Sequence, residues 1–418
     1  LAAITQANAS TYLTQVVSEG GLLGVDAPSL LQPGTRDYPT EVNEVSTGAP
    51  VSPWRTTYTA AALAANNISR VPTGGETYAI AVTADLYNVL QAAQVADGSL
   101  TLPSGHSIGS YVSDGDLPSL SSNFIAALLA GNVQTWANVE VNDAGVATPL
   151  TSFASAAGVT APGNNAIGVS IRNDGAAVGA LGYATFLGYP YVAGSSAPAN
   201  DVPDNATAEF NAAPLVKGPT GTTDTDNLLN DWQYGDNVSG HNNVLATTSG
   251  DTGSTYERIW GVALQTGDRN YNASLGYRYI KVDGAAATLA NIANGSYRFW
   301  GEGEVLVNPN APSYTASVGT FLTDFGNALG SVTTAYNVDN ATGSSTLAQP
   351  YGLAGIFATS KTAPSAAVPI PFPNSLPLAS GAQLVVPYTH NKGGYTSIGV
   401  VPYAYDPSGA FNPTIQLK

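Results

Sequence analysis

Hydrophobic positions along the chain follow two spacings, one typical of strands and the other of helices. β-Branched and aromatic residues over 77–82 predict a strand, and residues 275–282 alternate as in a half-buried strand. Apolar residues at helical spacing predict a helix over 120–132, with a serine cap at its start and Gly131 at its end. A last helix is predicted over 320–329. Alternating strands and helices predict an α/β fold with parallel sheets covered by helices.

Residues 166–181 combine a buried strand, a charged glycine turn and the start of a helix. The turn carries Arg172, Asp174 and Gly175. Strand–turn–helix junctions of this kind direct backbone N–H groups toward anions, so the turn is a candidate oxyanion site. The alternative is an ion pair between Arg172 and Asp174 that only orders the turn.

A second turn rich in glycine and hydroxyl groups spans residues 249–254, and the residues after it predict a helix over 256–264. Its hydroxyls either contact a ligand or cap that helix. They belong to Ser249, Thr252 and Ser254. The whole stretch 191–255 is rich in Asn, Asp, Gly, Ser and Thr, which predicts long surface loops or a connection between lobes.

The C-terminal part of the chain changes character from about residue 345. Proline and glycine recur every few residues and helical periodicity disappears. Short apolar runs at 385–386, 395–401 and 403–405 predict strands, so we expect a β-rich tail.

Composition narrows the classes of function. Of the 418 residues 44% are hydrophobic, so the chain should fold, but only 10% are charged, against about 25% in an average soluble protein. The net charge of −16 argues against nucleic acid and anionic membrane surfaces as partners. No apolar run approaches the ~20 residues that span a bilayer. The absence of Cys and Met, and a first residue that is Leu1, predict an exported chain without disulfides.

No pattern for catalysis or metal binding is present. The histidines His106, His241 and His390 lack metal-ligand spacing. The acidic residues between Asp224 and Asp236 lack the spacing of a calcium loop. Nucleophile-elbow, phosphate-loop and dinucleotide motifs are missing in a usable context. We therefore expect no enzymatic activity, no metal and no cofactor.

Four features resemble, in the same order, the PstS-type family of phosphate-binding proteins. They are residues 130–136 ending in Trp136, the turn at 169–177, the turn at 249–254, and Leu275-Gly-Tyr277 with the segment that follows it. The resemblance covers about residues 75–330. In that family an arginine and two hydroxyls hold the oxyanion, whereas Ala176 and Val178 stand at the hydroxyl positions here.

The resemblance implies a two-lobed fold of the type II periplasmic-binding-protein kind, with a ligand between the lobes. The β-rich C-terminal extension expected from its composition lies outside the resemblance. Residues 1–75 would be the N-terminal part of the first lobe, and 76–165 an α/β segment of a lobe. Residues 166–330 would form the second lobe and the return to the first, and 331–418 the tail.

Two functions fit these expectations. The favoured one is a structural subunit of an extracellular or cell-surface filament or surface layer, whose tail adds a strand to a neighbouring copy. Its candidate assembly residues are Tyr395, Val400, Tyr403, Ile415 and Leu417. The alternative is a periplasmic or extracellular solute-binding protein for an anion or another small ligand. Its candidate ligand-binding residues are Arg172, Asp174, Gly175, Ser249, Thr252 and Ser254.

Overall fold

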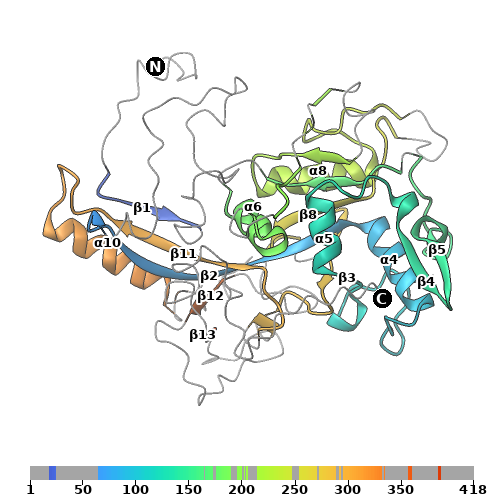
Figure 1. Ribbon diagram of the computed structural model, residues 1–418, viewed down its shortest axis with the longest axis horizontal. Coiled ribbons are helices and arrows are strands. Elements are labelled where there is room, and N and C mark those ends of the chain that lie inside the picture. Colours follow the sequence, from blue (N-terminus) through green and yellow to red (C-terminus); the bar gives the residue numbers. More distant parts are fainter. Residues whose placement is uncertain are drawn as a thin grey trace.

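The computed structural model has a mixed α/β architecture, which confirms the predicted fold class (Figure 1). The residues that it describes are 18–24, 65–163, 165–172, 176–189, 195–199, 202, 204–205, 214–246, 254–270, 273–288, 291–292, 295–331, 334, 356–359 and 385–386. No helix within these ranges is both long and apolar enough to span a membrane.

A nine-stranded sheet of mixed direction organises the chain. Its main path runs β1-β11-β2-β8-β6-β7, and β9, β12 and β13 join it off this path. The strands are β1 (Gly20–Leu23), β2 (Ser69–Thr83), β6 (Gly168–Ser170), β7 (Leu215–Lys217), β8 (Gly261–Thr266), β9 (Tyr277–Tyr279), β11 (Trp300–Val307), β12 (Ile356–Thr359) and β13 (Val385–Val386). β6 is parallel to both β7 and β8, whereas β2 is antiparallel to β8 and β11.

The 15-residue strand β2 extends through most of the molecule (Figure 1). Its first half pairs with β11, from Ser69 opposite Val307 to Thr77 opposite Trp300. Its second half pairs with β8, from Tyr78 opposite Thr266 to Val82 opposite Val262. One strand therefore belongs to both parts of the sheet.

Helices cover both faces of the sheet at β8. Strand residues alternate between faces, so Gly261 and Leu264 point to opposite sides. A Cβ on Gly261 would collide with Trp232, which lies on the helix α8. Gly182 of α6 lies against the side chain of Leu264. The core is therefore an α/β/α sandwich, with α8 on one face and α6 on the other.

The helices are α4 (Ala84–Ala96), α5 (Ser122–Leu129), α6 (Ala177–Gly182), α8 (Thr222–Tyr234) and α10 (Ala316–Leu329), and α6 continues as the π-helix η5 (Tyr183–Leu187). The 3₁₀ turns are η2 (Asp114–Asp116), η3 (Trp136–Asn138) and η4 (Leu150–Phe153). Two further two-stranded sheets pair β3 (Ser119–Leu120) with β10 (Lys281–Val282), and β4 (Glu140–Asp143) with β5 (Val146–Pro149).

Several predicted elements are confirmed. The strand expected over 77–82 lies within β2, and 275–282 contains β9 and β10. The helix expected over 120–132 is α5, where the Ser121 hydroxyl accepts a hydrogen bond from the Phe124 amide. Gly131 ends it with a φ of 72°. The last predicted helix is the second part of α10. Within 166–181 the expected strand and helix are β6 and α6, and the turn residues 173–175 lie outside the described residues.

Two predictions between residues 191 and 264 are wrong. The helix expected over 256–264 is instead an extended segment leading into β8, all of whose residues are buried. An apolar run buried on both faces has no alternation, so its spacing does not separate strand from helix. Of the two alternatives for 191–255, long surface loops are wrong, because the stretch contains β7 and α8, and a connection between lobes stays a prediction. The sequence does not predict α8, because several of its buried positions are polar and give no apolar periodicity. Thr225, Asp226 and Asp231 are buried, and their side chains make hydrogen bonds instead of apolar contacts.

Within the predicted C-terminal tail the structure describes two short strands, β12 and β13. β13 confirms the strand predicted at 385–386, and it pairs with β12. β12 in turn pairs with β2, with Ile356 opposite Glu76, so this part of the tail joins the chain's own sheet. The strands predicted at 395–401 and 403–405 lie outside the described residues. The predicted lobe boundaries stay predictions.

Candidate functional site

Polar side chains gather where the parallel strands end. β6, β7 and β8 are parallel, so their C-terminal ends meet at one edge of the sheet. Arg172 comes two residues after β6, and Asp268 two residues after β8. β2 runs the other way, which places Glu76 and Tyr78 at this same edge. Ligands of open α/β sheets bind outside the C-terminal ends of the strands. We call Glu76, Tyr78, Arg172 and Asp268 the Arg172 cluster.

Arg172 is half-buried, and its guanidinium has an unsatisfied donor. Within the described part of the chain its Nε is buried and has no hydrogen-bond partner. Leaving a buried donor unpaired costs about 1–3 kcal/mol, and more for a charged group. Burial lowers the pKa of Arg172, while the neighbouring Tyr78 and Glu76 oppose that shift. An arginine remains a cation at neutral pH in any such setting.

Glu76 and Asp268 bring two carboxyl groups to the same place. Tyr78 pairs with Thr266, and the amide of Gly267 donates to the carbonyl of Thr77 at 2.7 Å. At Glu76 itself β2 pairs with β11 and β12, and Asp268 lies near enough for its charge to act on the Glu76 carboxyl. Oδ1 of Asp268 is buried and lacks a hydrogen-bond partner among the described residues.

The environment of Glu76 raises the pKa of its carboxyl group toward 7. Burial and then the charge of Asp268 raise its pKa to about 7, against the opposing effects of Tyr78 and Arg172. The hydroxyl of Tyr78 donates to Oε2 of Glu76 at 3.2 Å. Burial raises the pKa of Tyr78 well above its ordinary value, so this hydroxyl stays a donor. Glu76 therefore changes charge near pH 7.

Arg269, which directly follows Asp268 in the chain, forms its ion pair with a carboxylate outside the Arg172 cluster. Arg269 donates from Nε to Oδ2 of Asp226 at 2.9 Å, on α8. Asp226 also accepts from Tyr277 at 2.7 Å and Gln265 at 2.9 Å. Arg172 is thus the cation of the Arg172 cluster, whose unpaired donor and unpaired acceptor suit a small polar molecule.

The structure does not bring Ser254 to Arg172. The Ser254 hydroxyl donates to the carbonyl of Tyr234 at 3.3 Å, at the end of α8. Residues 254–260 lead into the start of β8, so Ser254 lies at the opposite edge of the sheet from Arg172. No helix follows it, and the alternative of a helix cap is wrong.

The remaining predicted site residues lie outside the described residues, and their roles stay predictions. For ligand binding they are Asp174, Gly175, Ser249 and Thr252. For assembly they are Tyr395, Val400, Tyr403, Ile415 and Leu417. Sequence reasoning missed Glu76, Tyr78 and Asp268. Glu76 could have been noticed in the sequence, because it is a charged residue directly before the apolar residues of a predicted strand.

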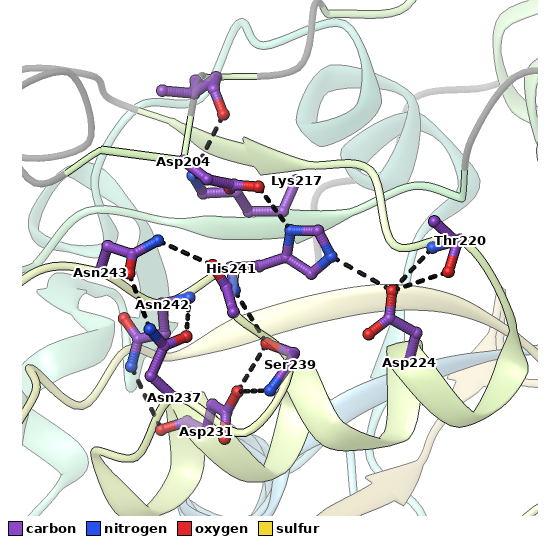
Figure 2. Close-up of polar contacts among 12 residues, drawn as sticks. Asp204, Lys217, Thr220, Asp224, Asp231, Asn237, Ser239, His241, Asn242 and Asn243 are labelled. Carbon is purple, nitrogen blue, oxygen red and sulfur yellow. Dashed lines mark hydrogen bonds and ion pairs between the residues drawn. The ribbon is translucent and has the colours of Figure 1, made fainter. Parts of the chain in front are cut away.

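A second polar cluster surrounds His241 on the α8 side of the sheet (Figure 2). The ring donates from Nδ1 to Oδ2 of Asp204 at 2.8 Å and from Nε2 to Oδ2 of Asp224 at 3.2 Å. Asp204 also accepts from Nζ of Lys217 at 2.9 Å. We call these four residues the His241 cluster. The hydrogen bond to Asp204, with smaller effects of both carboxylates, raises the pKa of His241 to about 9.

The His241 cluster is structural rather than catalytic. With a carboxylate at each ring nitrogen, the imidazole is doubly protonated and offers no lone pair to a proton or a metal. The nearby Ser239 donates to Asp231 at 2.6 Å and does not contact the ring. Two cations balance two anions here, and the cluster ties residue 204 and β7 to the first turn of α8 (Figure 2). Within the described ranges no three His, Cys, Asp or Glu side chains are placed to hold a metal.

Comparison with known proteins gives structural likeness alone. No protein-family model matches the sequence, and no curated protein matches it. Among solved structures, the chain is similar to a Clostridium perfringens protein with bound phosphate, at 14% identity and a TM-score of 0.33, covering 67% of this chain and 72% of that one. It is also similar to an ABC-type phosphate transport receptor from Vibrio cholerae, at 11% identity, a TM-score of 0.31, and coverage of 63% and 67%.

A third similar structure is PstS from Borrelia burgdorferi, at 10% identity and a TM-score of 0.29, covering 65% of this chain and 70% of that one. This third structure carries the name of the family that the motifs of the chain resemble. At these identities and TM-scores the likeness carries no argument about what this chain binds.

Proposed function

We propose that this chain is a non-enzymatic binding protein that holds a small polar solute at the Arg172 cluster. The observation that carries the proposal is the pair of unsatisfied buried atoms, Nε of Arg172 and Oδ1 of Asp268. Buried polar atoms in folded proteins are nearly always paired. A solute with an acceptor and a donor would satisfy both, at the sheet edge where ligands of α/β folds bind.

Catalysis has less support. Among the described residues, His241 contacts a carboxylate at each ring nitrogen, which leaves neither nitrogen for a substrate. Its neighbour Ser239 bonds to Asp231, so no serine–histidine pair forms there. The expected role as a subunit of a filament or surface layer depends on tail residues outside the described part, so it stays a prediction. The expected location, extracellular or at the cell surface with the periplasm as alternative, also stays a prediction.

The test is ligand screening of the full chain by thermal shift, followed by calorimetry on each hit. The screen includes phosphate, sulfate, carboxylates, amino acids, monosaccharides and polyamines. Arg172→Gln should weaken binding of the hit by about 10-fold or more, because hydrogen bonds to charged groups contribute about 1.5–3 kcal/mol.

A matched control is Arg258→Gln. Arg258 is also partly buried, and it pairs with Asp85 at 3.6 Å near the start of β8, at the other edge of the sheet. This variant should bind like the wild type. A wild type that binds nothing in the screen, or an Arg172→Gln variant with unchanged affinity, would refute the proposal.

A further inference from the structure

We propose that the solute is a small zwitterion of the amino-acid type, whose carboxylate binds Arg172 and whose ammonium group binds between Asp268 and Glu76. This inference rests on the proposed function and names the chemical class of its ligand. It differs from the anion expected from the sequence, and it follows from the carboxyl groups that the fold brings next to the arginine.

A fully ionised oxyanion fits the Arg172 cluster poorly. Such an ion offers acceptors only, so it can pair with the guanidinium but not with Oδ1 of Asp268. It would also face the carboxyl groups of Glu76 and Asp268. In a buried site that repulsion is weakly screened. Bringing a fully ionised oxyanion here would leave the acceptor unpaired and add a further negative charge.

A neutral polyol satisfies the hydrogen bonds but not the charges. No ion pair joins Arg172 to Asp268 or Glu76 within the part of the chain that the structure describes. The guanidinium of Arg172 has therefore lost water without gaining a close counter-ion among the described residues, which is costly for a buried group. A zwitterion supplies both counter-charges at once, with an acceptor for Nε and N–H donors for Oδ1.

Glu76 gives this ligand class a pH signature. The charged or titratable groups that face it are Tyr78 on β2, Asp268 after β8 and Arg172 after β6. The strands paired with β2 at this position present Gly301 and Ile356, which do not titrate. With a pKa of about 7, Glu76 gains its negative charge between pH 6 and pH 8. An ammonium group binds better as that charge appears, and an anion binds worse.

The experiment measures the affinity of the full chain by calorimetry at pH 6 and pH 8. The probes are the twenty standard amino acids, inorganic phosphate, sulfate and glucose. At least one amino acid should bind, about 3- to 10-fold more tightly at pH 8 than at pH 6. Glu76→Gln keeps the size and an acceptor oxygen, so it should remove this pH dependence and leave Arg172 in place.

The outcomes separate this inference from the proposed function. Binding of phosphate or sulfate that tightens toward pH 6 and improves in Glu76→Gln would refute the zwitterion while keeping solute binding. Binding of glucose alone, independent of pH, would refute it in the same way. Binding of no probe in this set or in the wider screen would refute the proposed function itself.

Discussion

The charge state of His241 should make the stability of the fold depend on pH above neutrality. Its pKa is about 9 in the folded protein, against 6.5 for an ordinary histidine. A group whose pKa is raised by folding stabilises the folded state fully below its unfolded pKa. That contribution should be complete below about pH 6.5 and should disappear as the pH rises through about 9.

The size of the effect follows from the shift. A difference of about 2.5 pH units corresponds to about 3.4 kcal/mol at 1.36 kcal/mol per unit. The His241 side chain is 16% exposed, but that of Asp204 is 38% exposed, so solvent screens the interaction. We therefore expect about 2 kcal/mol between pH 6 and pH 9.5.

The assay is urea unfolding of the wild type and of His241→Gln at these two pH values. Glutamine can still bond to one carboxylate but carries no charge. The variant should be less stable than the wild type by about 2 kcal/mol at pH 6, and the difference should shrink toward a few tenths at pH 9.5. A difference that stays the same at both pH values would show that packing, rather than the imidazolium charge, determines the role of His241.

Three further substitutions test the packing and local structure. Gly261→Ala should lose about 1–3 kcal/mol in urea unfolding, because its Cβ would lie 2.1 Å from Trp232. The control is Gly21→Ala in β1, where a Cβ meets open space, and it should change stability by less than about 0.5 kcal/mol. Ser121→Ala should lose about 1 kcal/mol in the same assay, since it removes the α5 cap, and an unchanged midpoint would contradict that role. Asp231→Asn should lose about 1–3 kcal/mol by thermal unfolding, because the carboxylate accepts the amides of residues 238 and 239, and equal stability would show those bonds to be unimportant.

Local signals in the sequence determined much of the secondary structure. The strand at 77–82, α5 with its serine cap and glycine end, and the junction before Arg172 could all be predicted. Each depends on residues within one or two turns of each other, where propensity, capping and periodicity act. The α/β class followed from the alternation of such elements.

The tertiary structure decided which segments lie together and therefore which side chains form the candidate site. The apolar run after Ser254 became β8 because β2 and β6 pair with it on either side. That pairing brings Glu76, Arg172 and Asp268 to one edge, although about a hundred residues separate each from the next along the chain. The sequence pointed to Arg172 through its turn. Its acidic neighbours could not be read locally, because strand order and register are set by burial across the whole sheet.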